Sequence, residues 1–300
     1  MEGGSMATAP YVKLNNGNKI PALGMGVVFL NTDGDARKTQ ETVDAAIDAG
    51  YRLFDNAAFY GNEKEIGQAL KNNGIPRKEL FISSKLKCGH HKYEDALSEF
   101  DKSLKRLGVD YLDMYLIHFP CPEHGLYTQA WKALEHLYKE GYVKNIGVSN
   151  FEISHMEKIF EMCEIKPVVD QLECNPYLTI EPLRNYLKEH EVVTEAWFPL
   201  GGPPVRLDGL PNEYKEKIMT EPVFLELSEK YQKSPAQIIL RWETQNGIIP
   251  VPKAANPVHM KENIEIFDFE MTEEELKQIS ALNADNRMGP SGDTNNEYWD

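Results

Sequence analysis

Cysteine is scarce in this sequence, and long hydrophobic runs are absent. The four cysteines are widely spaced and include no Cys-x-x-Cys pair, which disfavours a zinc site or a redox motif. We therefore expect free, mostly buried thiols in a reducing compartment. No run of about 18 apolar residues occurs, so the sequence predicts no transmembrane helix. Residues 1–10 also lack the basic and apolar regions of a signal peptide, which favours a cytoplasmic location.

Basic residues are in short supply as well. The chain has 32 Lys and Arg against 47 Asp and Glu, which gives a net charge of −15 at pH 7 with neutral histidines. Such an acidic protein repels phosphate backbones and anionic membranes, so the charge disfavours binding to nucleic acid or to a membrane surface. It still allows a local basic pocket for a small anionic cofactor. We expect a monomer that binds a small-molecule substrate and has no obligate protein partner.

Short apolar runs alternate with amphipathic segments along most of the chain. This order predicts parallel strands joined by helices, and eight such units favour a (β/α)8 TIM barrel of the α/β class over an open sheet. The predicted strands are Ala22–Gly26, Leu53–Asp55, Phe81–Lys85, Leu112–His118, Asn145–Ser149, Val168–Leu172, Val192–Trp197 and Ile248–Val251. The predicted helices are Thr39–Asp48, Lys64–Asn72, Tyr93–Leu107, Gln129–Glu140, Ser154–Cys163 and Glu181–His190, with two more beginning at Ser234-Pro235 and Asn256-Pro257.

The two ends of the chain differ from this pattern. Residues 1–10 are expected to be an N-terminal extension that starts with a cloning remnant, and residues 11–300 to form one barrel domain. An Asn-Gly turn near the start of that domain predicts a β-hairpin that covers the barrel floor. Residues 287–300 are polar and irregular. Tails of this kind often fray, but Tyr298 and Trp299 favour a C-terminal tail that folds over the barrel mouth.

Reactive side chains stand where the predicted strands end. Catalytic residues of TIM barrels lie at the C-terminal ends of the strands, so these side chains are expected to meet on one face. Asp55 and Lys85 end the second and third strands. His118 ends the fourth strand, and Tyr60 closely follows the second. A buried Lys85 would lower the pKa of Tyr60, and Asp55 would keep the lysine charged. A tyrosine tuned in this way can act as a general acid toward a carbonyl oxygen.

Each of these residues also has a purely structural explanation. Asp55 could cap a helix, His118 could be a satisfied core histidine, and Tyr60 could pack at the barrel mouth. Lys85 is harder to explain in this way, because a lysine rarely tolerates burial without a partner. An acid, a lysine, a tyrosine and a histidine at three adjacent strand ends together indicate a proton-transfer set.

Five long motifs then show a resemblance to a known family. They are Phe54–Glu63, Ile82–Leu86, Tyr111–Pro120, Ile146–Phe151 and Val169–Tyr177. In order and spacing these motifs resemble the aldo-keto reductase family, and the likeness covers nearly the whole chain. The sequence is similar to the bacterial 2,5-diketogluconate-reductase-like branch of that family. The resemblance implies an NAD(P)H-dependent carbonyl reductase that transfers a hydride from nicotinamide to an aldehyde or ketone.

The resemblance also implies a role for each site residue. Tyr60 would protonate the carbonyl oxygen as general acid, and His118 would orient the carbonyl by a hydrogen bond. Trp197 stands where the family usually has a tyrosine stacked on the nicotinamide ring, and its wider plane preserves the stacking. Leu200 and Gly201 would cover the pyrophosphate. The residues expected to hold the nicotinamide carboxamide are Ser149, Asn150 and Gln171.

The segment Val251–Asn263 matches the part of the family that binds the adenosine phosphate, and it departs from the pattern twice. Lys253 and Asn263 keep the expected residues, but the usual serine is Ala254 and the usual arginine is His259. Arginine offers a planar fork and a permanent charge, whereas histidine is only partly charged at neutral pH. The sequence favours NADPH and leaves NADH possible.

We also considered other functions for this sequence. A metal-dependent barrel hydrolase would use Asp55, His118 and Glu173 as ligands, but Lys85 would then stand beside the metal, so we expect no metal. A non-catalytic regulatory barrel of the same family is disfavoured by the short chain without extra domains. A Rossmann motif fails because Phe29 occupies the position of the third glycine.

The substrate is the least determined feature of the sequence. In this family the loops after the first and fourth strands and the tail set substrate specificity. Here these segments supply Val28, Phe29, Phe119 and Trp299, which predict an apolar and partly aromatic pocket. These residues do not distinguish an aldehyde, a ketone or a sugar as the substrate.

Overall fold

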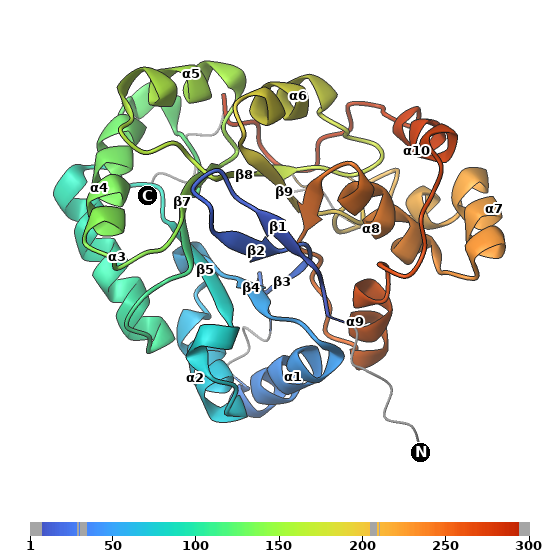
Figure 1. The fold of residues 1–300 in the computed structure, drawn as a ribbon, viewed down its shortest axis with the longest axis horizontal. Coiled ribbons are helices and arrows are strands. Elements are labelled where there is room, and N and C mark those ends of the chain that lie inside the picture. Colours follow the sequence, from blue (N-terminus) through green and yellow to red (C-terminus); the bar gives the residue numbers. More distant parts are fainter. Residues whose placement is uncertain (1–7, 29, 31–34, 205–208, 210, 294–300) are drawn as a thin grey trace.

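The structure is a computed structural model that describes residues 8–28, 30, 35–204, 209 and 211–293. Eight parallel strands form one sheet in the order β3 to β10, and helices surround it (Figure 1). The strands are β3 (Gly24–Gly26), β4 (Leu53–Asp55), β5 (Phe81–Leu86), β6 (Met114–Ile117), β7 (Ile146–Ser149), β8 (Val169–Glu173), β9 (Val193–Trp197) and β10 (Ile248–Pro250). All eight coincide with predicted strands to within a few residues.

The sheet curls round until its first strand meets the chain just after its last. The backbone N–H of Gly26 donates to the carbonyl oxygen of Pro252 at 3.2 Å. A Cβ atom on Gly26 would lie only 2.7 Å from the carbonyl oxygen of Val251, so this close approach requires a residue without a side chain. These contacts give the (β/α)8 barrel that the strand–helix alternation predicts.

Ten α-helices of the described residues lie outside the barrel. They are α1 (Ala36–Ala49), α2 (Glu63–Asn73), α3 (Tyr93–Leu107), α4 (Tyr127–Lys139), α5 (Ile153–Met162), α6 (Glu181–Glu189), α7 (Pro222–Tyr231), α8 (Pro235–Gln245), α9 (Pro257–Ile264) and α10 (Glu273–Ser280). Helices α7 and α10 are not among the predicted helices, whereas α3 has the predicted bounds. The start of α8 is fixed by a capping box, in which Ser234 and Gln237 each satisfy a backbone N–H of the other.

The predicted hairpin is present and closes the floor of the barrel. Strands β1 (Tyr11–Lys13) and β2 (Lys19–Pro21) pair antiparallel and cross the end of the barrel that faces the viewer in Figure 1. The Asn15 side chain donates to the carbonyl oxygens of Pro167 and Glu191, at 2.8 and 3.2 Å. These two residues precede β8 and β9, so the hairpin lies at the N-terminal ends of the strands.

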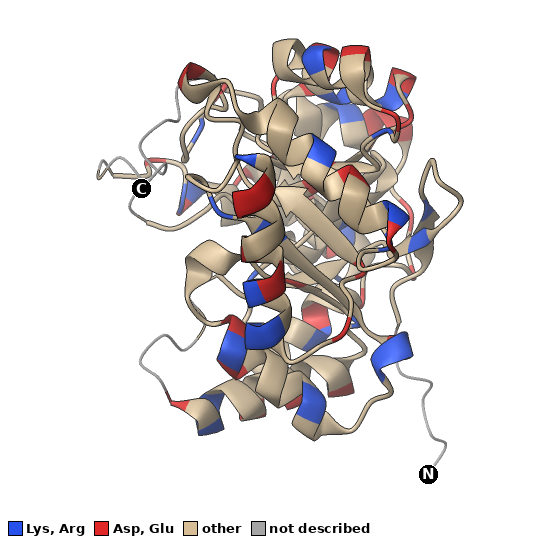
Figure 2. Cartoon of the chain, turned by 90° about the vertical axis from the view of Figure 1, so that its left-hand side faces the viewer, with Lys and Arg blue, Asp and Glu red and all other residues tan. Residues whose placement is uncertain are grey.

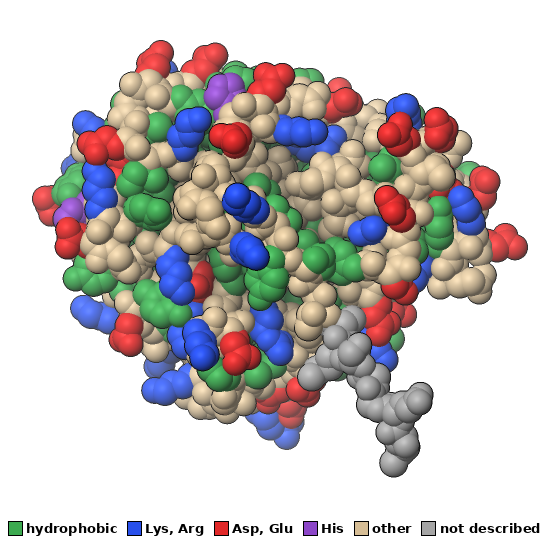
Figure 3. Space-filling view, in the orientation of Figure 1, with side chains coloured by type: hydrophobic (Ala, Val, Ile, Leu, Met, Phe, Trp, Pro, Cys, Tyr) green, Lys and Arg blue, Asp and Glu red, His purple; other side chains and the backbone are tan. Residues whose placement is uncertain are grey.

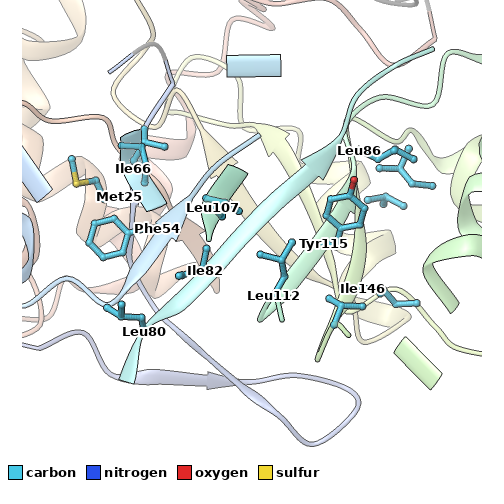
Figure 4. Packing of buried hydrophobic residues seen from close by; sticks show 14 of the residues in the cluster. Met25, Phe54, Ile66, Leu80, Ile82, Leu86, Leu107, Leu112, Tyr115 and Ile146 are labelled. Atoms are coloured by element: carbon cyan, nitrogen blue, oxygen red, sulfur yellow. The ribbon is translucent and has the colours of Figure 1, made fainter. Parts of the chain in front are cut away.

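Alternation along each strand decides which side chains enter the barrel. Phe54 and Ile82 belong to the large cluster that packs the strands against the helices (Figure 4). Their neighbours Leu53 and Phe81 belong to a second cluster with Leu14 and Ile20 of the hairpin region, inside the barrel. Because the side-chain period of a strand is two residues, Asp55 and Lys85 point inward like Leu53 and Phe81.

The described part of the C-terminal tail crosses the opposite end of the barrel, where β7 and β8 end. The backbone N–H groups of Met288 and Gly289 donate to the Glu173 carboxylate at 2.7 and 2.9 Å. Further on, a Cβ atom on Gly292 would lie 1.9 Å from the carbonyl oxygen of Asn150, so the tail lies directly on the loop after β7. Tyr298 and Trp299 lie outside the described residues.

Charged side chains of both signs are interspersed along the outer helices (Figure 2). The face that carries the hairpin shows the same mixture, with apolar side chains between the charges (Figure 3). Among the described residues, no helix is both long enough and apolar enough to cross a membrane. The cysteines are free thiols: Cys88, Cys121 and Cys174 are buried, and Cys163 is half-buried.

Candidate active site

A buried lysine occupies the centre of the candidate site. The Lys85 side chain is fully buried, and its Nζ lies 2.7 Å from both carboxylate oxygens of Asp55. The same ammonium group donates to the carbonyl oxygen of Asn56 at 3.0 Å and to the Tyr60 hydroxyl at 3.2 Å. The three donor directions of the lysine therefore end on Asp55, Asn56 and Tyr60.

Local structure brings these groups together. Strands β4 and β5 are neighbours in parallel register, so Asp55 and Lys85 both point inward near the C-terminal end of the barrel. A short 3-10 helix, Ala58–Tyr60, follows β4 and turns the tyrosine back toward the lysine. The order Asp55, Tyr60, Lys85 in the sequence thus becomes one hydrogen-bonded cluster.

Burial affects the lysine and the tyrosine differently. Burial opposes the charge on Lys85, but the adjacent Asp55 carboxylate outweighs it and raises the pKa of the lysine above its usual range. For Tyr60, burial raises the pKa above its usual range, and the nearby Lys85 only partly offsets this increase. The lowered tyrosine pKa expected from the sequence is therefore wrong. At neutral pH the site holds a cationic lysine and a protonated tyrosine.

His118 completes the set and is neutral. Its ring packs edge-on against Tyr60, with 5.9 Å between ring centroids. Burial and the positive charge of Lys85 hold the pKa of His118 well below its usual range. Phe119 stacks on the histidine at 5.1 Å, and the exposed Phe59 packs edge-on against it at 6.2 Å. Sequence analysis missed Phe59, although its position directly before Tyr60 in a mouth loop is a usable signal.

On the other side of the barrel mouth, three strand ends form a hydrogen-bonded chain. The Ser149 hydroxyl donates to the backbone carbonyl of Gln171 at 2.7 Å. The Asn150 amide donates to the Ser149 hydroxyl and to the backbone carbonyl of His118, both at 3.0 Å. The indole N–H of Trp197 donates to Asn150 Oδ1 at 3.0 Å. The structure thus brings together the four residues expected around the nicotinamide.

A buried glutamate that sequence analysis missed lies beneath this chain. Glu195 is fully buried, and its Oε2 accepts a hydrogen bond of 2.7 Å from the Gln171 side chain. Burial, followed by the nearby Asp55 charge, raises the pKa of Glu195 to about 8. Its position two residues before Trp197 in β9 is a signal that was available, because the two side chains share one face of the strand.

The loop after β9 is held in place by a second residue that the sequence did not suggest. Asn212 is buried, and its side-chain amide donates to the carbonyl oxygens of Gly201 and Pro203 at 2.7 and 2.9 Å. Leu200 is half-buried and Gly201 is buried. The backbone of Pro199–Gly202 therefore has a fixed course beside Trp197.

The residues expected at the adenosine end lie at and before α9. Lys253 and His259 are both exposed to solvent. Partial desolvation lowers the pKa of Lys253 from its usual value. Asn256 caps α9, its side chain accepting from the backbone N–H of Val258 at 2.9 Å. Asn263 is buried, and the buried Tyr51 hydroxyl donates to the carbonyl oxygen of Met260 in the same helix at 3.2 Å, so this part of the motif is built into the core.

Two of the four expected pocket residues are described. Phe119 is buried against His118, and Val28 is half-buried beyond β3. Phe29 and Trp299 lie outside the described residues. The aromatic character expected for the pocket is therefore carried, in the described part of the chain, by Phe119 together with Phe59.

The geometry disfavours the metal-dependent alternative. Both Asp55 oxygens are bound to the Lys85 ammonium, and the Glu173 carboxylate accepts two backbone N–H groups of the tail. Two of the three supposed ligands are thus occupied by positive or donor groups. Within the described ranges, no cluster of three His, Cys, Asp or Glu residues is arranged to hold a metal ion.

Comparison with known proteins bears on the family of the chain. The model of the Aldo/keto reductase family matches residues 22–284. The chain belongs to this family. The reductase is 43% identical to a glyoxal reductase of Bacillus subtilis over 282 residues, which cover 94% of the chain and 96% of that protein. It is 36% identical to the methylglyoxal reductase DkgA of Escherichia coli O157:H7 over 289 residues, which cover 96% of the reductase and 98% of that protein. This similarity supports the branch of the family that the sequence led us to expect.

A solved structure shows the same architecture with a cofactor bound. A Bombyx mori aldo-keto reductase in complex with NADP superimposes with a TM-score of 0.84 at 33% identity, covering 97% of the reductase and 99% of that chain. The reductase is therefore an NAD(P)H-dependent oxidoreductase, which confirms the enzyme class and the cofactor class expected from the sequence.

Proposed function

We propose that the reductase converts small aldehydes or ketones to alcohols, with Tyr60 as the general acid. The observation that carries this proposal is the 3.2 Å hydrogen bond between the buried Lys85 ammonium and the Tyr60 hydroxyl, at the carboxyl end of a barrel. A tyrosine that keeps its proton at neutral pH has the protonation state that a proton donor needs. Bound NADPH would supply the hydride for the carbonyl carbon.

The residues around the nicotinamide position fit such a cofactor. Trp197 offers an aromatic face that is only half-buried. No hydrogen bond within the described residues uses Gln171 Oε1, so this oxygen is available to accept from a carboxamide NH2 group. Ser149 and Asn150 line the same edge. We infer that these residues hold the nicotinamide ring, while Leu200 and Gly201 cover the pyrophosphate.

Each catalytic side chain then has a separate task. Tyr60 donates its hydroxyl proton to the carbonyl oxygen as negative charge develops there. The Lys85 cation stabilises the resulting tyrosinate, since the two groups are already hydrogen-bonded. Asp55 keeps the lysine charged and fixed. Neutral His118 can donate one ring N–H to the same carbonyl oxygen without competing for the proton.

For the cofactor we propose NADPH ahead of NADH. Lys253 supplies an exposed cation that suits a 2′-phosphate, and His259 lies on the first turn of α9. His259 replaces the arginine that the family pattern leads us to expect, so the preference is weaker than a bidentate arginine contact would give.

The substrate class that fits best is a small carbonyl compound such as a 1,2-dicarbonyl. Phe59 and Phe119 flank His118 and form an apolar wall beside the reacting position. The names of the two relatives, a glyoxal reductase and a methylglyoxal reductase, favour the same class.

We also propose that residues 11–300 form a single domain that works as a cytoplasmic monomer. The free thiols favour a reducing compartment such as the cytoplasm. The net charge of −15 disfavours association between copies of the chain. Size-exclusion chromatography with light scattering would test the oligomeric state, and a dimer mass would contradict it.

A substrate panel with both cofactors tests the proposed function directly. We expect NADPH oxidation with methylglyoxal, glyoxal and a simple aromatic aldehyde, followed at the absorbance of the reduced cofactor. Slower oxidation of NADH is expected in the same assay. The proposal fails if neither cofactor is consumed with any carbonyl compound while the protein is folded.

A further inference from the structure

Glu195 is a buried acidic residue with no task in the mechanism described above. It lies in β9, and its side chain is fully buried inside the barrel. Gln171 and Glu195 are register partners on the neighbouring strands β8 and β9, so their side chains point to the same side at the same height. Ser149 is the register partner of Gln171 on β7, which places all three in one layer beneath the nicotinamide-binding edge.

The contact between the two side chains has a defined polarity. Gln171 Nε2 donates to Glu195 Oε2 at 2.7 Å, a short distance for an amide donor. A carboxylate offers acceptors only, and a carboxylic acid still offers its carbonyl oxygen. In both protonation states Glu195 can therefore bind the NH2 end of the amide, which leaves Gln171 Oε1 at the opposite end.

The orientation of the Gln171 amide matters because a carboxamide has two different ends. Rotation by 180° would exchange an acceptor for a donor at the cofactor edge. Asn150 has no such freedom, because Trp197 binds its Oδ1 and two other groups accept from its Nδ2. In the described part of the chain, Glu195 supplies the corresponding constraint for Gln171.

We propose that Glu195 is a positioning residue that fixes the Gln171 carboxamide with Oε1 toward the nicotinamide carboxamide. This inference rests on the proposed function, because it concerns the same cofactor site. The second carboxylate oxygen of Glu195 is buried and forms no hydrogen bond with any described residue. Such a group is costly to bury. A requirement for one orientation of the Gln171 amide in cofactor binding explains why this buried carboxyl group is present.

The test compares binding of the whole cofactor with binding of its adenosine end. Glu195→Met removes the acceptor and keeps a side chain of similar length. Calorimetric titration with NADPH and with 2′,5′-ADP, which lacks the nicotinamide, separates the two ends. We expect E195M to weaken NADPH binding about tenfold, as for the loss of one buried hydrogen bond. Its affinity for 2′,5′-ADP should stay unchanged.

Two further variants serve as controls. Glu195→Gln retains an oxygen that can accept from Gln171, so it should bind NADPH much like the wild type. Glu243 is another fully buried glutamate, located in α8, and neither of its carboxylate oxygens has a hydrogen-bond partner among the described residues. Glu243→Met makes the same chemical change away from the site and should leave both affinities unchanged. If E195M does not fold, Glu195→Val removes the acceptor with a side chain that suits a strand.

The outcomes separate this inference from the proposed function. If the wild type binds neither NADPH nor 2′,5′-ADP, the proposed function is wrong. If the wild type binds both and the acceptor-free variants bind NADPH equally well, Glu195 does not position Gln171. If E195M lowers the affinities for NADPH and 2′,5′-ADP equally, Glu195 has a general structural role, which would also overturn the inference.

Discussion

Lys85 Nζ lies 3.2 Å from the Tyr60 hydroxyl, and both carboxylate oxygens of Asp55 hold the lysine in that position. This relationship joins residues 25 positions apart in the sequence. It also makes the chemistry of Tyr60 depend on a buried ion pair. Burial favours the neutral tyrosine, while the adjacent lysine cation favours the tyrosinate.

Replacing Tyr60 by Phe should remove the proton donor and keep the aromatic ring. We expect kcat for carbonyl reduction to fall by about 10²-fold or more, the usual contribution of general acid catalysis. The affinity for NADPH should remain near the wild-type value, because the hydroxyl is assigned to the substrate. Steady-state kinetics and calorimetric binding check both parts, and wild-type turnover by Y60F would contradict the assignment.

Replacing Lys85 by Met should affect stability and chemistry together. It leaves Asp55 buried without its cation, and breaking a buried pair in this way costs about 3–5 kcal/mol. It also raises the pKa of Tyr60 further, since burial remains and the opposing charge is lost. We expect lower urea stability and loss of most activity.

Lys102 provides the control for this substitution. Its side chain is 53% exposed, and its buried partner Glu99 also pairs with Arg106, so K102M should cost only about 0–1 kcal/mol. If K85M were no less stable than K102M and equally active, Lys85 would not have the central position assigned to it.

Replacing His259 by Arg should increase discrimination between the two cofactors. The 2′-phosphate is the only chemical difference between NADPH and NADH, and arginine adds a permanent charge with a bidentate fork. We expect NADPH binding to tighten by about 1–3 kcal/mol. NADH affinity is the internal control and should not change. Fluorescence titration of both cofactors measures this, and equal shifts would place His259 away from the phosphate.

The raised pKa of Glu195 predicts how stability depends on pH. Burial, followed by the Asp55 charge, raises the pKa of Glu195 from 4.5 to about 8 in the folded protein. Between these values the unfolded chain releases the proton while the folded protein keeps it. The contribution of Glu195 to the free energy of unfolding therefore decreases as the pH rises. The unfolding free energy of the wild type, relative to E195Q, should therefore fall between pH 5 and pH 8.

The slope of this decrease is limited to about 1.4 kcal/mol per pH unit for one proton. Urea unfolding of both proteins at several pH values measures the difference. The E195Q variant keeps the shape of the side chain and cannot titrate, so most other pH effects cancel. A difference that is independent of pH would show that Glu195 is ionised throughout this range.

Local information in the sequence was sufficient for the barrel and for the side-chain cluster at its mouth. Strand-length apolar runs separated by amphipathic helices require parallel pairing, and parallel strands place their carboxyl ends at one edge. Asp55, Lys85 and His118 follow from that rule, because each stands at or next to a strand end. The hairpin over the floor was equally local, since an Asn-Gly turn specifies it.

Only the tertiary structure decided the features that depend on depth and on distant partners. The pKa of Tyr60 is raised and not lowered as expected, because the effect of burial exceeds that of the Lys85 charge. The sequence indicates which charged residue lies nearby, but it does not show how completely the tyrosine is removed from water. The Gln171–Glu195 hydrogen bond requires the register between β8 and β9. The contact between Glu173 and the tail spans more than a hundred residues and follows from the fold as a whole. Such pairings depend on how the elements pack, which the local sequence pattern does not specify.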